Sequence, residues 1–73
     1  MKFAPLPSVF PEYEIFGVRT EAGSYVISCN KDDETWGASF SPLIGLVRYI
    51  GEDLASRREA EQACEAHYAK QKN

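Results

Sequence analysis

The feature that most constrains this chain is a C-terminal segment that reads as a helix with a small inward face. Residues 56–70, SRREAEQACEAHYAK, begin with a capping box, in which Ser56 caps a backbone N–H group and Glu59 reaches back. Helical spacing places one stripe on the inward side: Ala60, Ala63, Cys64 and His67. Because these side chains are small, the helix can lie close to a sheet, and the sheet must supply the bulk of the core.

Three upstream segments have the aromatic and β-branched composition of strands. They are residues 13–20, 25–30 and 35–40, separated by a turn at 21–24 and a polar connection at 31–34. Their large side chains can supply the missing bulk: Tyr25, Ile27, Trp36 and Phe40. Short connections between successive strands favour an antiparallel meander.

Residues 42–50 fit two structures. As a helix, the segment has Ser41 as its cap and an apolar stripe from Leu43 to Ile50; as a strand, LVRYI pairs back after a turn at 42–45. Gly45 and Gly51 weaken a helix by about 1 kcal/mol each, and LVRYI is rich in strand formers, so we favour the strand. The predicted fold is α+β, with a three- to four-stranded antiparallel meander packed against one C-terminal helix (β-β-β-β-α).

The chain divides into a proline-rich N-terminal arm, residues 1–12, and a single small domain, residues 13–73. Pro5, Pro7 and Pro11 keep the arm extended, because proline fixes φ and disfavours helix in the residue before it. The arm also carries four large apolar side chains, and leaving each in water costs about 1.5–3 kcal/mol. We therefore expect the arm to pack on the domain or on a partner.

Composition and charge exclude several classes of protein. The net charge of the 73 residues is −3, which is unlike the basic footprint of a duplex-binding protein. The N-terminal segment lacks the apolar stretch of a signal peptide, and no apolar run approaches the roughly 18 residues of a membrane span. Two cysteines cannot form a disulfide framework. We expect a cytoplasmic location with free thiols and no membrane contact.

The pair Cys64 and His67 has three interpretations. The first, which we favour, is a core thiol beside a histidine at the edge of the stripe. The second is a zinc site of Cys29, Cys64 and His67, which lacks a fourth protein ligand. The third is a catalytic thiolate, which the neighbouring glutamates disfavour. The sequence also lacks a glycine-rich phosphate loop and a GxSxG motif. We expect no catalytic residue, no metal and no cofactor.

The predicted sheet has apolar side chains on both faces, whereas one helix covers only one face. The second face then needs a cover: the arm, a second copy of the chain or a target protein. We predict that six exposed aromatic and acidic residues contact a partner: Phe10, Phe16, Asp32, Asp33, Glu34 and Tyr49.

From Trp36 onward the chain resembles small bacteriophage and prophage proteins. The resemblance is carried by TWGASF and by YIGEDLASRREAEQACEAHYAK, in which Ser56, Glu59, Ala60, Cys64 and His67 follow the pattern of a closing helix. Many proteins of that kind inhibit or redirect host machinery, including the anti-CRISPR proteins. The resemblance implies a phage-encoded inhibitor acting on a host protein, and it implies no catalytic role.

These observations lead to one main functional hypothesis and one alternative. The main hypothesis is a non-enzymatic protein-binding module that inhibits a bacterial defence complex of the CRISPR type. The alternative is a homodimeric nucleic-acid-binding protein that uses Arg48, Arg57 and Arg58, against which the net charge of −3 argues.

Overall fold

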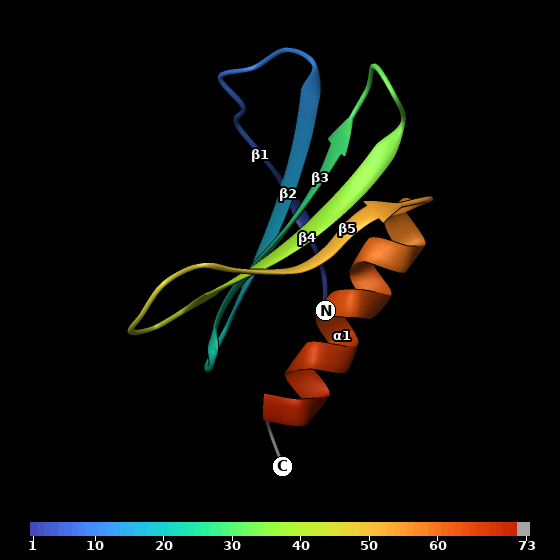
Figure 1. The fold of residues 1–73 in the computed structure, drawn as a ribbon. Coiled ribbons are helices and arrows are strands. Elements are labelled where there is room, and N and C mark those ends of the chain that lie inside the picture. Colours follow the sequence, from blue (N-terminus) through green and yellow to red (C-terminus); the bar gives the residue numbers. More distant parts are fainter. Residues whose placement is uncertain (72–73) are drawn as a thin grey trace.

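The computed structural model describes residues 1–71, which form a five-stranded antiparallel sheet followed by one helix (Figure 1). The strands are β1 (Ala4–Leu6), β2 (Tyr13–Thr20), β3 (Gly23–Asn30), β4 (Thr35–Pro42) and β5 (Arg48–Leu54), and the helix is α1 (Arg57–Gln71). Neighbours in the chain are neighbours in the sheet. The predicted antiparallel sheet with one C-terminal helix is confirmed, although the predicted number of strands was too low. The last two residues of the predicted domain lie outside the described part.

The additional strand is β1, which lies within the proline-rich arm. Ala4 pairs with Gly17 and Leu6 with Ile15, so this part of the arm extends the edge of the sheet. An edge strand tolerates Pro5, because its outer side makes no ladder hydrogen bonds. Gly17 makes room for this strand, since a Cβ atom at Gly17 would lie 2.6 Å from Cδ1 of Leu6.

Residues 42–50 contain no helix. β4 runs to Pro42, residues 43–47 form a loop, and β5 begins at Arg48 and continues through Gly51 to Leu54. The strand interpretation is therefore correct from Arg48 onward, whereas the predicted strand residues Leu46 and Val47 lie in the loop. The pairing of β5 with β4 is irregular on both sides of Ala38, and Asp53 has a left-handed backbone with φ of 52°.

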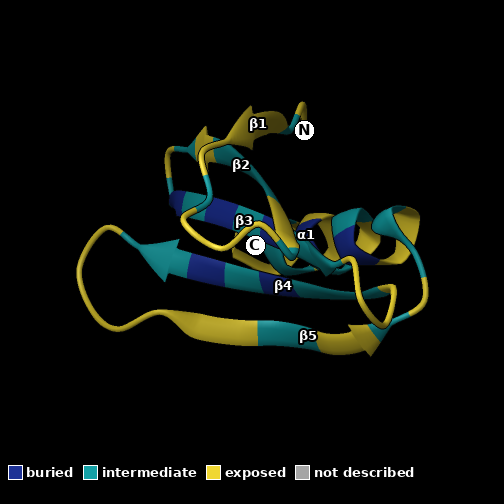
Figure 2. Cartoon of the chain, turned by 90° about the horizontal axis from the view of Figure 1, so that it is seen from above, coloured by how far each residue is buried: buried dark blue, intermediate teal, exposed yellow. Residues whose placement is uncertain are grey.

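The register of the central strands decides which side chains face the helix. Tyr25 pairs with Phe40, Ile27 with Ala38 and Cys29 with Trp36, and these positions share the face against which α1 packs. Alternation places the intervening residues on the opposite face, here called the open face. Figure 2 shows the buried positions on the central strands β3 and β4 and on α1, with β5 and the loop before it largely exposed.

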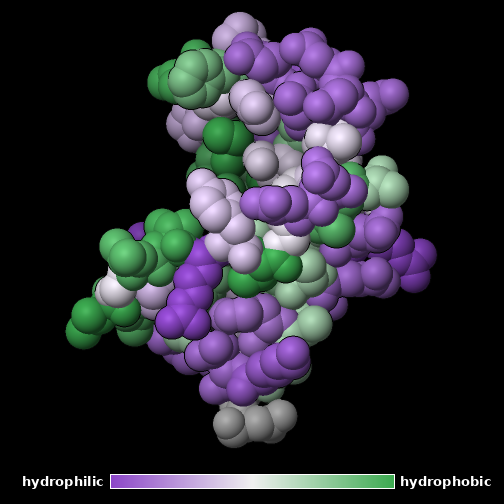
Figure 3. All heavy atoms as spheres, in the orientation of Figure 1, coloured by the Kyte–Doolittle hydropathy of each residue, from purple (hydrophilic) through white to green (hydrophobic). Residues whose placement is uncertain are grey.

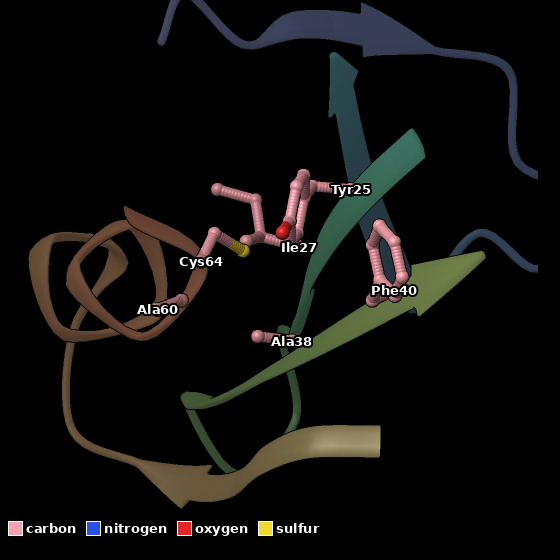
Figure 4. Packing of buried hydrophobic residues seen from close by; sticks show 6 residues of the cluster. All are labelled: Tyr25, Ile27, Ala38, Phe40, Ala60 and Cys64. Carbon is pink, nitrogen blue, oxygen red and sulfur yellow. The ribbon is translucent and has the colours of Figure 1, made fainter. Parts of the chain in front are cut away.

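The core combines large side chains of the sheet with small side chains of the helix. Its buried members are Tyr25, Ile27, Ala38, Phe40, Ala60 and Cys64 (Figure 4). Trp36 is partly buried and packs against this cluster. The prediction that the sheet supplies the bulk beneath a small-residue helix is confirmed.

The helix begins where the capping box predicts. The backbone N–H of Glu59 donates to Oγ of Ser56 at 3.2 Å, which satisfies one of the free N–H groups of the first turn. Arg57 lies over the ring of Phe16, with its guanidinium carbon 4.3 Å from the ring centre. Within residues 1–71, no helix combines the length and the apolar character needed to cross a bilayer.

Candidate functional site

The loop between β4 and β5 presents a run of apolar side chains to solvent. Leu43, Ile44, Leu46 and Val47 are 74%, 94%, 87% and 54% exposed, and Tyr49 behind them is 77% exposed. We call residues 43–47 the apolar tip. In Figure 3 a group of hydrophobic residues protrudes from the molecule on the side where Figure 1 shows this loop.

Local sequence explains why the apolar tip stands away from the body. No charged residue lies between Thr35 and Val47, Pro42 ends β4, and Gly45 adopts a φ of 121° that other residues rarely take. None of residues 43–47 belongs to the described core cluster. Each large apolar side chain left in water forgoes about 1.5–3 kcal/mol of burial, so this loop contributes little to folding and is available for contact.

The open face of the sheet holds a shallow groove that runs over β4 between β3 and β5. Its floor is made of small side chains: Val26, Ser28, Gly37 and Ser39. Tyr13 and Tyr49 also line it, as do three acidic residues: Asp33, Glu52 and Asp53. We call this feature the open-face groove.

An ordered acidic turn connects β3 to β4 at one end of the groove. Oδ1 of Asn30 accepts the N–H of Asp32 at 3.0 Å, and Oδ1 of Asp33 accepts both the N–H and the hydroxyl of Thr35, at 3.2 and 2.7 Å. Glu34 has a left-handed φ of 59°. These side-chain bonds to the backbone define the turn, and Asp32, Asp33 and Glu34 are all exposed on it.

The other predicted contact residues lie in three different environments. Phe10 is 59% exposed and meets the ring of Tyr13 edge-on, with the ring centres 6.4 Å apart. It lies near the acidic turn, because the N–H of Lys31 donates to the carbonyl of Glu12 at 2.8 Å. Tyr49 lies on the open face. Phe16 faces the helix instead and stacks on Trp36 with ring centres 6.2 Å apart.

The second face of the sheet, the open face, differs from the expectation. We expected both faces to be apolar, but the centre of the open face is mainly small and polar, with Ser28, Gly37 and Ser39 beside Val26. The exposed apolar surface lies in the apolar tip. Sequence reasoning missed the tip because Leu43, Leu46 and Val47 were assigned to a packed helix stripe or to a strand.

Cys64 and His67 belong to the packing between helix and sheet. Cys64 is fully buried, and its burial, followed by the charges of Glu61 and Glu65, raises its thiol pKa to about 11. Nδ1 of His67 lies 2.7 Å from the hydroxyl of Tyr25. The core-thiol interpretation is confirmed. Among residues 1–71, no three His, Cys, Asp or Glu side chains lie together as metal ligands, so Cys29, Cys64 and His67 are not assembled into a site.

Two of the three arginines of the alternative hypothesis, Arg48 and Arg57, lie near opposite ends of β5. Arg48 begins β5 and Arg57 follows its end, so about 20 Å of strand separates them. Arg57 is also engaged by Glu61, with Nε and Oε2 2.7 Å apart. The separation and the ion pair weigh against a basic track formed by Arg48 and Arg57.

Comparisons of the chain with protein-family models, with curated proteins and with solved structures found no match. The surface of the molecule is therefore the basis for a functional proposal.

Proposed function

We propose that this protein is a non-enzymatic protein-binding module and that the apolar tip is its main anchor. The observation that supports this proposal is the exposure of Leu43, Ile44, Leu46 and Val47, each of which is more than half exposed on one protruding loop. Exposed apolar patches that are contiguous are typical of interaction sites. A protruding loop with four exposed apolar side chains suits insertion into an apolar pocket of a partner.

The apolar tip acts as one part of a larger contact. A standard interface involves roughly 20–30 residues on each side, whereas the tip has only five, so neighbouring surface must contribute. Tyr49 lies two residues after the tip and is exposed, and aromatic side chains are frequent among the residues that dominate binding energy. The acidic turn and Phe10 extend the same surface at the far end of the sheet.

The proposal also includes the class of the partner protein. The resemblance to phage proteins supports a bacterial defence complex of the CRISPR type as the target. The acidic turn would then occupy a basic groove that otherwise holds nucleic acid, since Asp32, Asp33 and Glu34 present three exposed carboxylates together. Complementary charge of this kind favours fast and specific association.

Affinity capture from a bacterial host lysate treated with nuclease tests the proposal. The bait is the full chain, compared with the variant Leu43→Ser/Ile44→Ser/Leu46→Ser and with the matched control Val9→Ser, which is 88% exposed elsewhere. We expect wild type and control to retain one partner protein in stoichiometric amount, which mass spectrometry identifies. The complex should then form again from the two purified proteins. The tip variant should lose it.

Three outcomes would contradict the proposal. The first is retention of the same partner by the tip variant. The second is a tip-dependent dimer of the chain alone in analytical ultracentrifugation, which would make a second copy the cover of the tip. The third is tip-dependent binding to phosphatidylcholine vesicles without a protein partner, which would identify a lipid surface instead.

A further inference from the structure

We propose that the open-face groove binds an extended, positively charged segment of the partner protein. This inference rests on the proposed function, because it assigns a second part of the same contact. It adds the chemistry of that part: arginine or lysine side chains carried on a chain of about four extended residues.

The groove exists because the residues at its floor have small side chains, and larger side chains at these strand positions would fill it. A Cβ atom at Gly37 would meet only Oγ of Ser28 at 3.7 Å and the carbonyl oxygen of Gly51 at 3.6 Å, which are ordinary contacts. The backbone of Gly37 therefore does not require glycine. Glycine inside a strand costs stability and often marks a place where a ligand or another backbone approaches closely.

The negative charge of the groove favours a positively charged occupant. Asp33, Glu52 and Asp53 line it, and among its described lining residues there is no lysine or arginine. Tyr13 and Tyr49 add two aromatic rings, and cations are attracted to the faces of such rings. The hydroxyl of Ser28 supplies a hydrogen-bonding group at the floor.

The dimensions fit an extended chain. The groove follows β4 from Thr35 to Ser39, a distance of about 13 Å at the rise of a strand. Tyr49 pairs with Ser39, so this end of the groove leads to the apolar tip. A partner that accepts the tip can therefore continue along the open face toward the acidic turn.

Addition of the segment to the free edge of β5 fits the structure less well. The ladder between β4 and β5 is irregular at two places, and Asp53 has a left-handed backbone. Irregularities of this kind hinder further strand pairing at an edge. The segment therefore lies on the face of the sheet.

A peptide titration with the full chain tests this inference. The probe is a short fluorescein-labelled peptide of alternating arginine and serine, and the matched peptide has glutamate in place of arginine. We expect salt-sensitive binding of the arginine peptide only, with shifts of the backbone amide resonances of Ser28, Gly37 and Ser39. The variant Glu52→Gln/Asp53→Asn should weaken binding about fivefold, the effect of losing two exposed charge pairs.

Two further variants distinguish an effect of the groove on peptide binding from an effect of the net charge of the protein. Glu59→Gln/Glu65→Gln removes the same charge from exposed positions on α1 and should leave the affinity unchanged. Gly37→Val fills the groove without changing charge and should weaken binding by a similar factor. Equal loss in the α1 control, unchanged affinity in Gly37→Val, or amide shifts confined to other faces would each overturn the inference. The proposed role of the apolar tip would be unaffected by those outcomes, because the affinity capture experiment tests it separately.

Discussion

The hydroxyl of Tyr25 lies 2.7 Å from Nδ1 of His67, which joins the middle of the sheet to the later turns of α1. The two residues are 42 positions apart in the chain. The ring of Phe40 packs beside both of them, at 4.7 Å from the ring centre of each. His67 thus serves as the partner of a buried hydroxyl in the packing of the helix on the sheet.

The variant Tyr25→Phe should lower the free energy of unfolding by about 1 kcal/mol, the typical contribution of one hydrogen bond. The ring is retained, so the loss reports the hydroxyl and its contact with His67. Urea denaturation followed by circular dichroism measures the change. Tyr49→Phe is the matched control, because its hydroxyl lies on an exposed side chain, and equal effects in the two variants would contradict the prediction.

Cys64 should be unreactive in the folded protein. Its thiol is buried and has a pKa of about 11, and thiol reagents attack the thiolate. In a Cys29→Ser background, which leaves Cys64 alone, we expect the thiol to react with Ellman's reagent at mildly alkaline pH only when denaturant is added. Prompt reaction of one thiol per native molecule would show that the helix does not cover it.

The same thiol makes the protein less stable at alkaline pH. An exposed thiol has a pKa of 9.0, whereas Cys64 in the folded state has a pKa of about 11 because burial disfavours the thiolate. Between these values the unfolded chain binds fewer protons than the folded chain, so the free energy of unfolding falls as pH rises, by up to about 1.4 kcal/mol per pH unit. Well below pH 9 this loss is absent.

Denaturation curves across that range, for wild type and Cys64→Ala, measure this slope. The variant should have lower stability at neutral pH because a buried group is deleted, but a flatter decline above pH 9. Some decline should remain, because burial also raises the pKa of the Tyr25 hydroxyl and the hydrogen bond to Glu21 raises the pKa of the Tyr68 hydroxyl. Parallel slopes in the two proteins would contradict the assignment to Cys64.

Two glycines of the sheet should respond in opposite ways to replacement by alanine. Gly23 has a φ of 147°, and a Cβ atom there would collide with the carbonyl oxygen of Ser41 and the ring of Phe40. We expect Gly23→Ala to destabilise the protein by more than about 1 kcal/mol. Gly37 has space for a Cβ atom, so Gly37→Ala should be neutral or stabilising by up to about 1 kcal/mol. Thermal unfolding of both variants provides the comparison.

Much of the fold follows from local sequence, and the exceptions have physical reasons. The capping box at Ser56 and the small-residue stripe are local signals, and both predict the position and inward face of α1. β1 was missed because Pro5 indicates irregular chain unless an edge of the sheet accepts it. The start of β5 was missed because Leu46 and Val47 have the composition of a strand, whereas the pairing of β5 with β4 begins only at Arg48, opposite Phe40.

The binding surface was harder to predict than the fold. Exposure of the acidic turn and of Tyr49 followed from their types and positions. Phe16 was expected on the surface, but strand alternation does not reveal which of two apolar faces a helix covers, and the structure places this ring beneath Arg57. The apolar tip had no local signal as a surface, since a run such as LIGLV usually indicates core.

The apolar tip should contribute little to folding, which separates its role from that of the core. Because Leu43, Ile44 and Leu46 are at least 74% exposed, replacing all three by serine should change the free energy of unfolding by no more than about 0.5 kcal/mol per site. Ile27→Ala, at a fully buried position, should cost about 2–5 kcal/mol in the same measurement. A large loss in the tip variant would mean that the tip packs against the chain itself in solution. Unchanged stability together with loss of the captured partner would show that these side chains serve binding and not folding.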